Sequence, residues 1–256
     1  MRLRKKIALI TGGNSGIGKA IAYELANEGA QVIINYLDNR KEAEEIVSQL
    51  KDLRYNNQKS LCVCADVSST TALRQMIDSI KEKVGNIDIL VNNAGIQTEK
   101  PFVKLTEDEV NRIWAVNLKG TFFCSQFIAR QMIDNCIKGK IINISSIHQT
   151  IPRHNIAHYA ASKGAIRMLT KSLALELASY NINVNSIAPG AIKTPMNRVV
   201  LSNNDLIGKI SKKIPMHRFG NAQEVAKVAS FLASDDADYV TGATYYIDGG
   251  LSLGNL

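Results

Sequence analysis

The 256 residues predict a doubly wound α/β fold, in which a parallel sheet of about seven strands carries helices on both faces. Short apolar runs alternate with amphipathic stretches along the whole chain, as repeated strand–helix units do. Several runs, such as Ile7–Ile10 and Ile141–Ile144, are apolar almost throughout, which is typical of strands buried on both faces. No repeat, low-complexity tract or linker interrupts this pattern. We therefore expect residues 1–256 to form a single domain.

The individual elements follow from the same alternation. Strands are expected at Ile7–Thr11, Gln31–Tyr36, Lys59–Ala65, Ile87–Asn92, Lys140–Ser145, Asn183–Ala188 and Thr244–Ile247. Helices are expected at Gly16–Glu28, Arg40–Lys51, Ser69–Lys83, Glu107–Asn135, His158–Tyr180 and Ala222–Ala233. The polar and basic segment 195–220 breaks the rhythm, and its position suggests a lid over the carboxyl ends of the strands.

Composition excludes several classes of protein. The chain is 45% hydrophobic and 21% charged, which is ordinary for a globular protein. Its net charge of +8 is scattered, with modest clusters only at Arg2–Lys6 and Lys209–Lys213, and no nucleic-acid-binding motif accompanies them. We expect no nucleic-acid partner, and we interpret the charge as favouring solubility and anionic cofactors.

Cysteine usage and hydropathy indicate a cytoplasmic protein. Cys62, Cys64, Cys124 and Cys136 lack metal-binding spacing, so no metal is expected. Cys62 and Cys64 share one face of a predicted strand and are interpreted as core thiols, which suits a reducing compartment. The run Ile7–Ile10 is too short for a signal peptide. No 18-residue apolar run is present, so neither a spanning helix nor a membrane partner is expected.

A glycine-rich turn predicts a nucleotide site. Thr11–Gly18 follows the first strand and opens the first helix, with Gly12, Gly16 and Gly18 at the spacing of a phosphate-binding turn. Glycine lets a phosphate approach the backbone, and the N-terminus of the helix offers free N–H groups. The expected fold is therefore of the Rossmann type, with its cofactor at the first strand–helix crossover.

The choice between NAD and NADP depends on the end of the second strand. The residue expected to contact the adenosine ribose is Tyr36, which is not the acid that marks strict NAD use. Arg40 and Lys41 follow and suit a 2′-phosphate, whereas Ser15 is not basic. NADP, or dual use of NADP and NAD, is expected. Asp66 and Val67 end the third strand, where adenine would lie. As the alternative, Asp66 caps the helix that begins near Ser69.

One stretch of the chain contains the residues of an acid–base catalyst. Ser146 precedes Tyr159 by thirteen positions, and Lys163 follows four positions later. Residues at i and i+4 lie on one face of a helix, about 5–6 Å apart at Cβ. A lysine there lowers the pKa of a tyrosine towards neutrality, where general acid–base catalysis is most effective. A second Tyr-x-x-x-Lys spacing, Tyr55 to Lys59, has no suitably placed hydroxyl and is interpreted as solvated loop.

Five motifs together resemble the short-chain dehydrogenase/reductase family. They are Thr11–Gly18, Asn92–Gly95, Asn117, Ser146 with Tyr159-x-x-x-Lys163, and Pro189-Gly190 with Thr194. The resemblance covers nearly the whole chain and implies hydride transfer between a nicotinamide and an alcohol or carbonyl. It implies that Tyr159 is the acid/base, that Lys163 lowers its pKa and holds the nicotinamide ribose, that Ser146 orients the substrate oxygen, and that Asn117 shapes a proton relay.

The same resemblance implies a set of cofactor-binding residues: Thr11, Gly12, Asn14, Ser15, Gly16, Ile17, Gly18, Tyr36, Asp66, Val67, Asn93, Ala94, Gly95, Tyr159, Lys163, Pro189, Gly190, Ile192 and Thr194. Structural alternatives remain for some of them. Asn117 could be a buried residue whose amide is hydrogen-bonded within its own helix. Pro189-Gly190 could form a simple turn, and Thr194 could cap a helix. Ser145 competes with Ser146, although adjacent strand residues point to opposite faces. The family spacing favours Ser146.

Within the family, Ser145–His148, His158–Gly164, Pro189–Pro195 and Ile214–Met216 look most like bacterial glucose 1-dehydrogenases. That implies oxidation of a sugar C1 hydroxyl to a lactone, with Ser146, His148 and Tyr159 contacting the substrate; the alternative for His148 is an ordinary loop histidine. Gln97 departs from these enzymes, which carry an acid there. The basic lid, with Lys209, Lys212 and Lys213, is more charged than a neutral sugar requires.

Two other functions remain open. One is NADPH-dependent reduction of 3-oxoacyl thioesters, which the basic lid suggests because it would attract an acidic carrier protein. The other is a nucleotide-binding sensor without catalysis, against which the intact Ser146, Tyr159 and Lys163 argue.

The expected partners are a small-molecule substrate and further copies of the chain. The helices Glu107–Asn135 and His158–Tyr180 are apolar around much of their circumference, which is typical of buried helices. The family resemblance implies that these helices pair across a dimer face and that the last strand completes a homotetramer.

Overall fold

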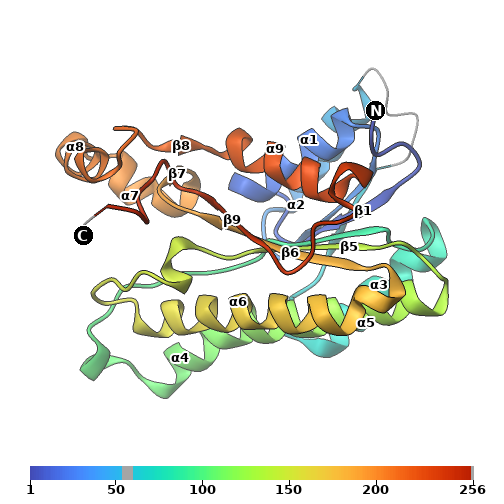
Figure 1. The fold of residues 1–256 in the computed structure, drawn as a ribbon, viewed down its shortest axis with the longest axis horizontal. Coiled ribbons are helices and arrows are strands. Elements are labelled where there is room, and N and C mark those ends of the chain that lie inside the picture. Colours follow the sequence, from blue (N-terminus) through green and yellow to red (C-terminus); the bar gives the residue numbers. More distant parts are fainter. Residues whose placement is uncertain (54–59, 255–256) are drawn as a thin grey trace.

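The computed structural model describes residues 1–53 and 60–254, and seven of its strands form one parallel sheet (Figure 1). The order across the sheet is β3-β2-β1-β4-β5-β6-β9, and every neighbouring pair is parallel. Strand order reverses between β1 and β4, which is where doubly wound folds bind ligands. The strands are β1 (Ile7–Ile10), β2 (Gln31–Tyr36), β3 (Leu61–Cys64), β4 (Ile89–Asn92), β5 (Lys140–Ile144), β6 (Asn183–Pro189) and β9 (Thr244–Ile247).

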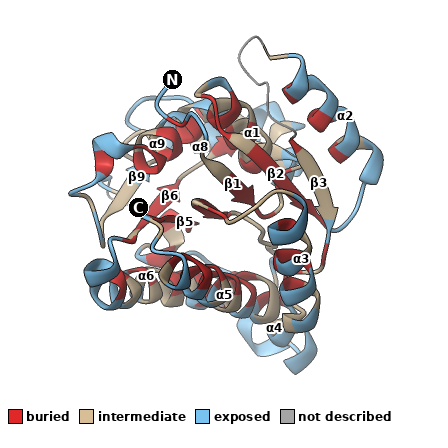
Figure 2. Ribbon diagram, turned by 90° about the vertical axis from the view of Figure 1, so that its right-hand side faces the viewer, coloured by how far each residue is buried: buried red, intermediate tan, exposed pale blue. Residues whose placement is uncertain are grey.

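Helices cover both faces of this sheet. One layer contains α1, α2 and α9, and the other contains α3, α4, α5 and α6 (Figures 1 and 2). Their bounds are α1 (Gly16–Asn27), α2 (Arg40–Lys51), α3 (Thr70–Lys83), α4 (Glu107–Trp114), α5 (Thr121–Asp134), α6 (Ala157–Leu177) and α9 (Ala222–Ala233). The doubly wound Rossmann-type fold predicted from the sequence is confirmed.

The alternation of side chains along each strand divides the core into two layers. Ile10 and Ile34 are register partners and pack under α1 and α9, whereas Leu9 and Ile33 pack on the opposite face with α3 and α5. All four are fully buried. The near-continuous apolar runs in the sequence therefore reflect strands that contribute to both layers.

Two predicted segments contain structure that periodicity did not separate. The helix expected over Glu107–Asn135 is α4 and α5 joined without a break by a π-helical turn, Ala115–Gly120. The predicted lid contains two short helices, α7 (Arg198–Leu201) and α8 (Asn204–Lys213), neither of which has a buried residue. Two short strands, β7 (Ile192–Lys193) and β8 (Gly220–Asn221), pair at its base.

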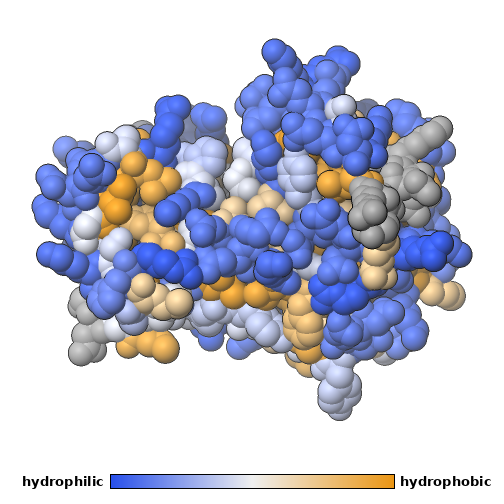
Figure 3. All heavy atoms as spheres, turned by 90° about the horizontal axis from the view of Figure 1, so that it is seen from above, coloured by the Kyte–Doolittle hydropathy of each residue, from blue (hydrophilic) through white to orange (hydrophobic). Residues whose placement is uncertain are grey.

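The surface over α9, α1 and α8 is mostly hydrophilic (Figure 3). Apolar side chains gather in small patches, one of them at the end of the molecule that carries α7 and α8 (Figure 3). Exposed members of this end are Met196, Val199, Leu206 and Met216. The lid therefore presents apolar as well as basic side chains to solvent.

Two sequence interpretations concern β3 and the loop before it. Cys64 is exposed, so its interpretation as a core thiol is wrong, whereas the half-buried Cys62 packs against the core. β3 is an edge strand, paired with β2 alone. The Tyr55–Lys59 pair lies outside the described residues.

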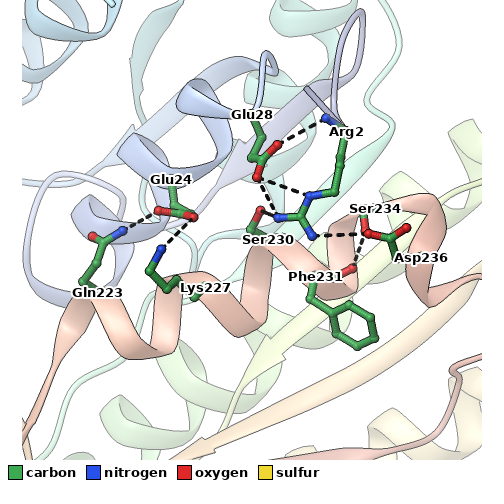
Figure 4. A network of polar contacts seen from close by, with 9 residues as sticks. All are labelled: Arg2, Glu24, Glu28, Gln223, Lys227, Ser230, Phe231, Ser234 and Asp236. Atoms are coloured by element: carbon green, nitrogen blue, oxygen red, sulfur yellow. Dashed lines mark hydrogen bonds and ion pairs between the residues drawn. The ribbon is translucent and has the colours of Figure 1, made fainter.

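The N-terminal segment is bound to α1 and α9. The Arg2 guanidinium donates to Glu28 at 2.7 Å and to Ser230 at 3.0 Å, and Asp236 accepts a further bond (Figure 4).

Across residues 1–53 and 60–254, every helix falls short of the length and apolarity needed to cross a membrane.

Candidate active site

Three side chains predicted for catalysis meet at the carboxyl end of β5. Ser146 follows this strand, and Tyr159 and Lys163 lie on the first turns of α6. All three are buried, with 5–7% of each residue exposed. The Ser146 side chain acts on the Tyr159 hydroxyl, whose pKa it lowers. The Lys163 ammonium donates to the Ile144 carbonyl at 2.9 Å, so the last residue of β5 positions it.

Burial controls the pKa values of this group. It raises the pKa of Tyr159, and the Ser146 side chain and the Arg153 charge lower it by smaller amounts. Burial also lowers the pKa of Lys163 to about 8. The charge of Lys163 is not among the causes of the Tyr159 shift, so the lowering that their spacing suggests stays a prediction. Lys163 Nζ lies 5.7 Å from the centre of the Tyr159 ring and bonds to a carbonyl instead.

Adjacent serines serve different purposes, as the alternation along a strand predicts. The Ser145 hydroxyl donates to the Lys163 carbonyl at 3.4 Å and so holds α6 against β5. The Ser146 hydroxyl accepts from the His148 N–H at 3.2 Å. Of the two serines, Ser146 is the one whose side chain influences the pKa of Tyr159.

Asn117 lies in the π-helical turn and connects three elements. Its Oδ1 accepts from the Ile96 N–H at 2.8 Å, and its Nδ2 donates to the Ile96 carbonyl at 3.0 Å and to Ser162 Oγ at 3.2 Å. The alternative that its amide is satisfied within its own helix is wrong. Asn117 instead fixes the loop after β4 against α6, beside Lys163.

His148 borders the same group. Its ring lies edge-on to that of Tyr159, with 6.4 Å between ring centres, and its Nδ1 is 2.9 Å from the Ile151 carbonyl. The ring is therefore held beside the tyrosine by its own loop, as a substrate-contacting residue would be.

The glycine-rich turn is shaped by close approach of the backbone. Gly12 and Gly16 have φ of +60° and +52°, which disfavour other residues. A Cβ on Gly18 would lie 2.3 Å from the Gly12 carbonyl oxygen, which leaves no space for a side chain. Ser15 begins α1 without a capping hydrogen bond from its side chain. The first N–H groups of α1 are therefore free of a side-chain cap, and the turn fits a pyrophosphate.

Thr11 and the loop after β4 interlock. The Thr11 hydroxyl accepts from the backbone N–H groups of Asn93 and Ala94, both at 3.0 Å. The Asn93 amide donates back to the carbonyls of Thr11 and Gly12. A Cβ on Gly95 would lie 3.8 Å from Lys163 Nζ, so this loop also reaches the catalytic group. These contacts join the turn after β1 to the turn after β4 at the reversal of strand order.

The remaining predicted cofactor residues surround the same edge of the sheet. Asn14 donates to the Asp38 carbonyl at 3.0 Å, and Asp38 follows the buried Tyr36 by two residues. Asp66 accepts from the N–H and hydroxyl of Ser68, while Ser69 caps α3. The alternative that Asp66 is that cap is wrong. Val67 packs against Gly120.

The Pro189–Thr194 stretch lies across from the glycine-rich turn. Thr194 is 3.5 Å from the position a Gly16 Cβ would take, and Gly190 packs against Asp248. Ile192 is buried, and Ile17 packs against the core beneath the turn. Thr194 precedes a short helical turn but makes no capping bond with its side chain. The two motifs predicted to bind the cofactor, about 180 residues apart in the chain, are thus neighbours in space.

Sequence reasoning missed two residues of this site. Ser162 donates to the Tyr159 carbonyl at 2.7 Å and accepts from Asn117. Trp114 Nε1 donates to the His158 carbonyl at 3.0 Å, next to Tyr159. Ser162 lies three residues after Tyr159, and Trp114 lies three residues before Asn117. Residues at this spacing are neighbours on a helix, so the spacing is the signal in the sequence that could have identified both.

Comparisons with known proteins agree with this geometry. Residues 12–252 match the family described as Enoyl-(Acyl carrier protein) reductase. Glucose 1-dehydrogenase 2 of Bacillus subtilis is 40% identical over 252 residues, which cover 98% of this chain and 96% of that protein. For 3beta-hydroxysteroid dehydrogenase 1 of Eggerthella lenta, the identity is 38% over 98% of this chain and 95% of that protein.

A solved structure is also similar to this chain. The gluconate 5-dehydrogenase from Burkholderia cenocepacia, in complex with NADP and tartrate, has a TM-score of 0.93 at 39% identity, covering 99% of this chain and 98% of that chain. This chain belongs to the short-chain dehydrogenase/reductase family and is an NAD(P)-dependent oxidoreductase acting on CH–OH groups. The resemblance found in the sequence is confirmed.

Proposed function

We propose that this chain transfers a hydride between NAD(P) and an alcohol or carbonyl carbon, with Tyr159 moving the proton. The observation that carries the proposal is that Ser146, Tyr159 and Lys163 are buried together at the carboxyl end of β5, where the Lys163 ammonium donates to the Ile144 carbonyl at 2.9 Å. A bound nicotinamide supplies or accepts the hydride. Ser146 and Tyr159 act on the oxygen of the reacting group.

In the oxidative direction, Tyr159 in its phenolate form accepts the proton of the substrate hydroxyl while the hydride leaves the carbon. The C–H and O–H bonds break and the carbonyl double bond forms. Ser146 donates a hydrogen bond to the substrate oxygen. Lys163, in its protonated form, stabilises the phenolate because a nearby cation favours the charged state. Asn117 holds the loop and the helix that position this pair.

The cofactor site is proposed to extend from the glycine-rich turn to Thr194. The turn and the N-terminus of α1 would hold the pyrophosphate, and Gly95 and Lys163 would border the nicotinamide ribose. At the adenosine ribose, Tyr36 takes the position of an acid, and Arg40 is exposed but paired with Glu44 at 2.7 Å. This arrangement supports use of NADP or of both nicotinamide cofactors.

The first candidate substrate is a sugar oxidised at its C1 hydroxyl to the lactone. The identity to glucose 1-dehydrogenase 2 supports it, as does the placement of His148 beside Tyr159. The test is D-glucose with NAD and with NADP, followed by nicotinamide absorbance. Ser146→Ala is expected to lower kcat about 10²-fold or more, as loss of an oxyanion-stabilising donor does. No turnover of glucose with either cofactor would remove this candidate.

The second candidate is reduction of 3-oxoacyl thioesters with NADPH. The description of the matching family and the exposed Lys209, Lys212 and Lys213 of the lid favour it. A β-ketoacyl thioester assayed beside D-glucose separates the two candidates, because each predicts turnover of one compound and not of the other.

We further propose that residues 1–256 act as one domain, within a cytoplasmic homotetramer. Its cysteines are all free, which suits a reducing compartment. Residues of α4, the π-helical turn and α5 line an open groove of about 440 Å³ with a largely apolar wall. Trp114 and Phe122 are more than 40% exposed in it, and Met168 of α6 is also exposed. Apolar faces of this kind support association between copies.

A further inference from the structure

The segment between Ser146 and Tyr159 is attached to the loop after β4 by three contacts. The Arg153 guanidinium pairs with the Glu99 carboxylate. The Lys100 N–H donates to the Asn155 carbonyl at 2.8 Å, and Thr98 Oγ1 lies 2.7 Å from His158 Nε2. Residues 96–100 and 151–158 therefore form a two-loop wall beside Tyr159.

Arg153 is a cation of this wall, on the segment that leads into Tyr159. Its pairing with Glu99 holds the guanidinium between the two loops. Its charge also opposes the rise in the pKa of Tyr159 that burial causes. Lys100, the other cation of the wall, pairs with both carboxylate oxygens of Glu109 at 2.7 Å.

The pair between Arg153 and Glu99 is exposed to solvent. The side chains are 44% and 57% exposed. Exposed ion pairs contribute little to stability, so a competing anion can replace Glu99 at small cost. A guanidinium binds carboxylates and phosphates through two parallel hydrogen bonds, which makes Arg153 suited to such an exchange.

The lid contributes charge of the same sign. Its exposed cations outnumber its one carboxylate, Asp205; they are Arg198, Lys209, Lys212, Lys213 and Arg218. Thr194, at the base of the lid, lies beside Gly16 of the cofactor turn. The lid therefore begins at the edge of the same site and adds a positive field there.

We propose that Arg153 is a specificity-determining residue that binds a carboxylate or phosphate of the substrate, so that the site prefers anionic to neutral alcohols and ketones. Glu99 is the internal counter-ion that this group replaces. The inference rests on the proposed role of Tyr159 and names the class of substrate that Tyr159 serves.

Matched substrates test the proposal. D-glucose and D-glucose 6-phosphate share the C1 hydroxyl and differ in charge, and D-glucuronate keeps that hydroxyl and carries a carboxylate at C6 in place of the phosphate. Wild type should favour an anion over D-glucose. Arg153→Gln should lower kcat/KM for that anion about tenfold or more, through KM, because bonds to charged groups are strong. The loss should be smaller for D-glucose, so that the preference for the anion falls, and Arg153→Lys should recover part of that preference.

Two further variants complete the set. Glu99→Gln should tighten binding of the anion, and added salt should weaken it. Arg2→Gln is the matched control, because it removes one positive charge from an exposed ion pair on the α1–α9 side (Figure 4). It should leave the kinetics of both substrates unchanged.

Binding provides a readout independent of turnover. Trp114 is the only tryptophan of the chain and bonds to the residue before Tyr159, so its fluorescence should report titration with each anion. No preference for either anion in turnover or in this titration would overturn the inference and leave the proposed function intact. Equal loss of glucose and anion turnover in Arg153→Gln would also overturn it. Absence of all turnover, with anion-selective binding retained, would overturn the proposed function alone.

Discussion

The two ends of the candidate site differ in how tightly the chain constrains them. At the cofactor end, a Cβ on Gly18 would lie 2.3 Å from a backbone carbonyl, whereas a Cβ on Gly208 of α8 would meet nothing within 4 Å. Helix α1 has five buried residues and α8 has none. The cofactor end is therefore specified by steric fit. The lid has few constraints, so its sequence can change with the substrate while the fold is retained.

The largest effect is expected when a glycine is replaced by alanine at each end of the candidate site. Gly18→Ala should lower the free energy of unfolding by about 1–3 kcal/mol because the turn must open to admit it. Its affinity for NADPH should fall at least about tenfold, since the phosphate-binding turn is displaced. Urea unfolding and fluorescence titration with NADPH measure the two effects.

Gly208→Ala is the control in the lid. It should raise the free energy of unfolding by about 0.5–1 kcal/mol, because alanine favours the helix over glycine and finds open space. Equal effects of the two substitutions would contradict the difference between the ends.

A second prediction concerns the buried Lys163, whose pKa is lowered to about 8 from an ordinary 10.5. Between these values the unfolded chain binds more protons than the folded chain, so stability should rise with pH by about 3 kcal/mol at most. Stability from this group is thus present above pH 10.5 and is lost as pH falls through 8. Denaturant unfolding at pH 8–10 should show this slope in wild type and a smaller slope in Lys163→Met.

A substitution in the groove of α4 and α5 is expected to have the smallest effect on the folded single chain. It should, however, clearly change the association of copies. Phe122 is 42% exposed there, and Val199 of the lid is 76% exposed. Phe122→Glu should reduce the molar mass measured by light scattering, because a buried unpaired charge opposes association. Val199→Glu should leave the mass unchanged. A wild-type monomer would refute the proposed assembly.

Much of the fold could be predicted from periodicity. Each of the seven expected strands is present, with ends shifted by a few residues, because buried parallel strands produce apolar runs that are hard to mistake. The helices α7 and α8 were not predicted individually, since they are short, at 4 and 10 residues, and lie in a segment that is polar and basic overall. Exposure of Cys64 depends on the position of β3 at the sheet edge, which a single strand pattern does not specify.

The sequence predicts which residues form the site, but it does not predict the direction of their pKa shifts. Ser146, Tyr159 and Lys163 are brought together as their spacing suggests. The direction of the Tyr159 pKa shift is set mainly by burial, which results from packing. The partners of Asn117, Ile96 and Ser162, are likewise separated from it by 21 and 45 positions.

The central claim is that Tyr159 moves the proton during hydride transfer. Tyr159→Phe keeps the buried ring and removes the hydroxyl, so single-turnover absorbance of the nicotinamide, with NADPH affinity measured in parallel, tests it most directly. We predict that turnover falls about 10²–10⁴-fold while NADPH still binds. Turnover at the wild-type rate, with the cofactor bound equally well, would contradict the mechanism.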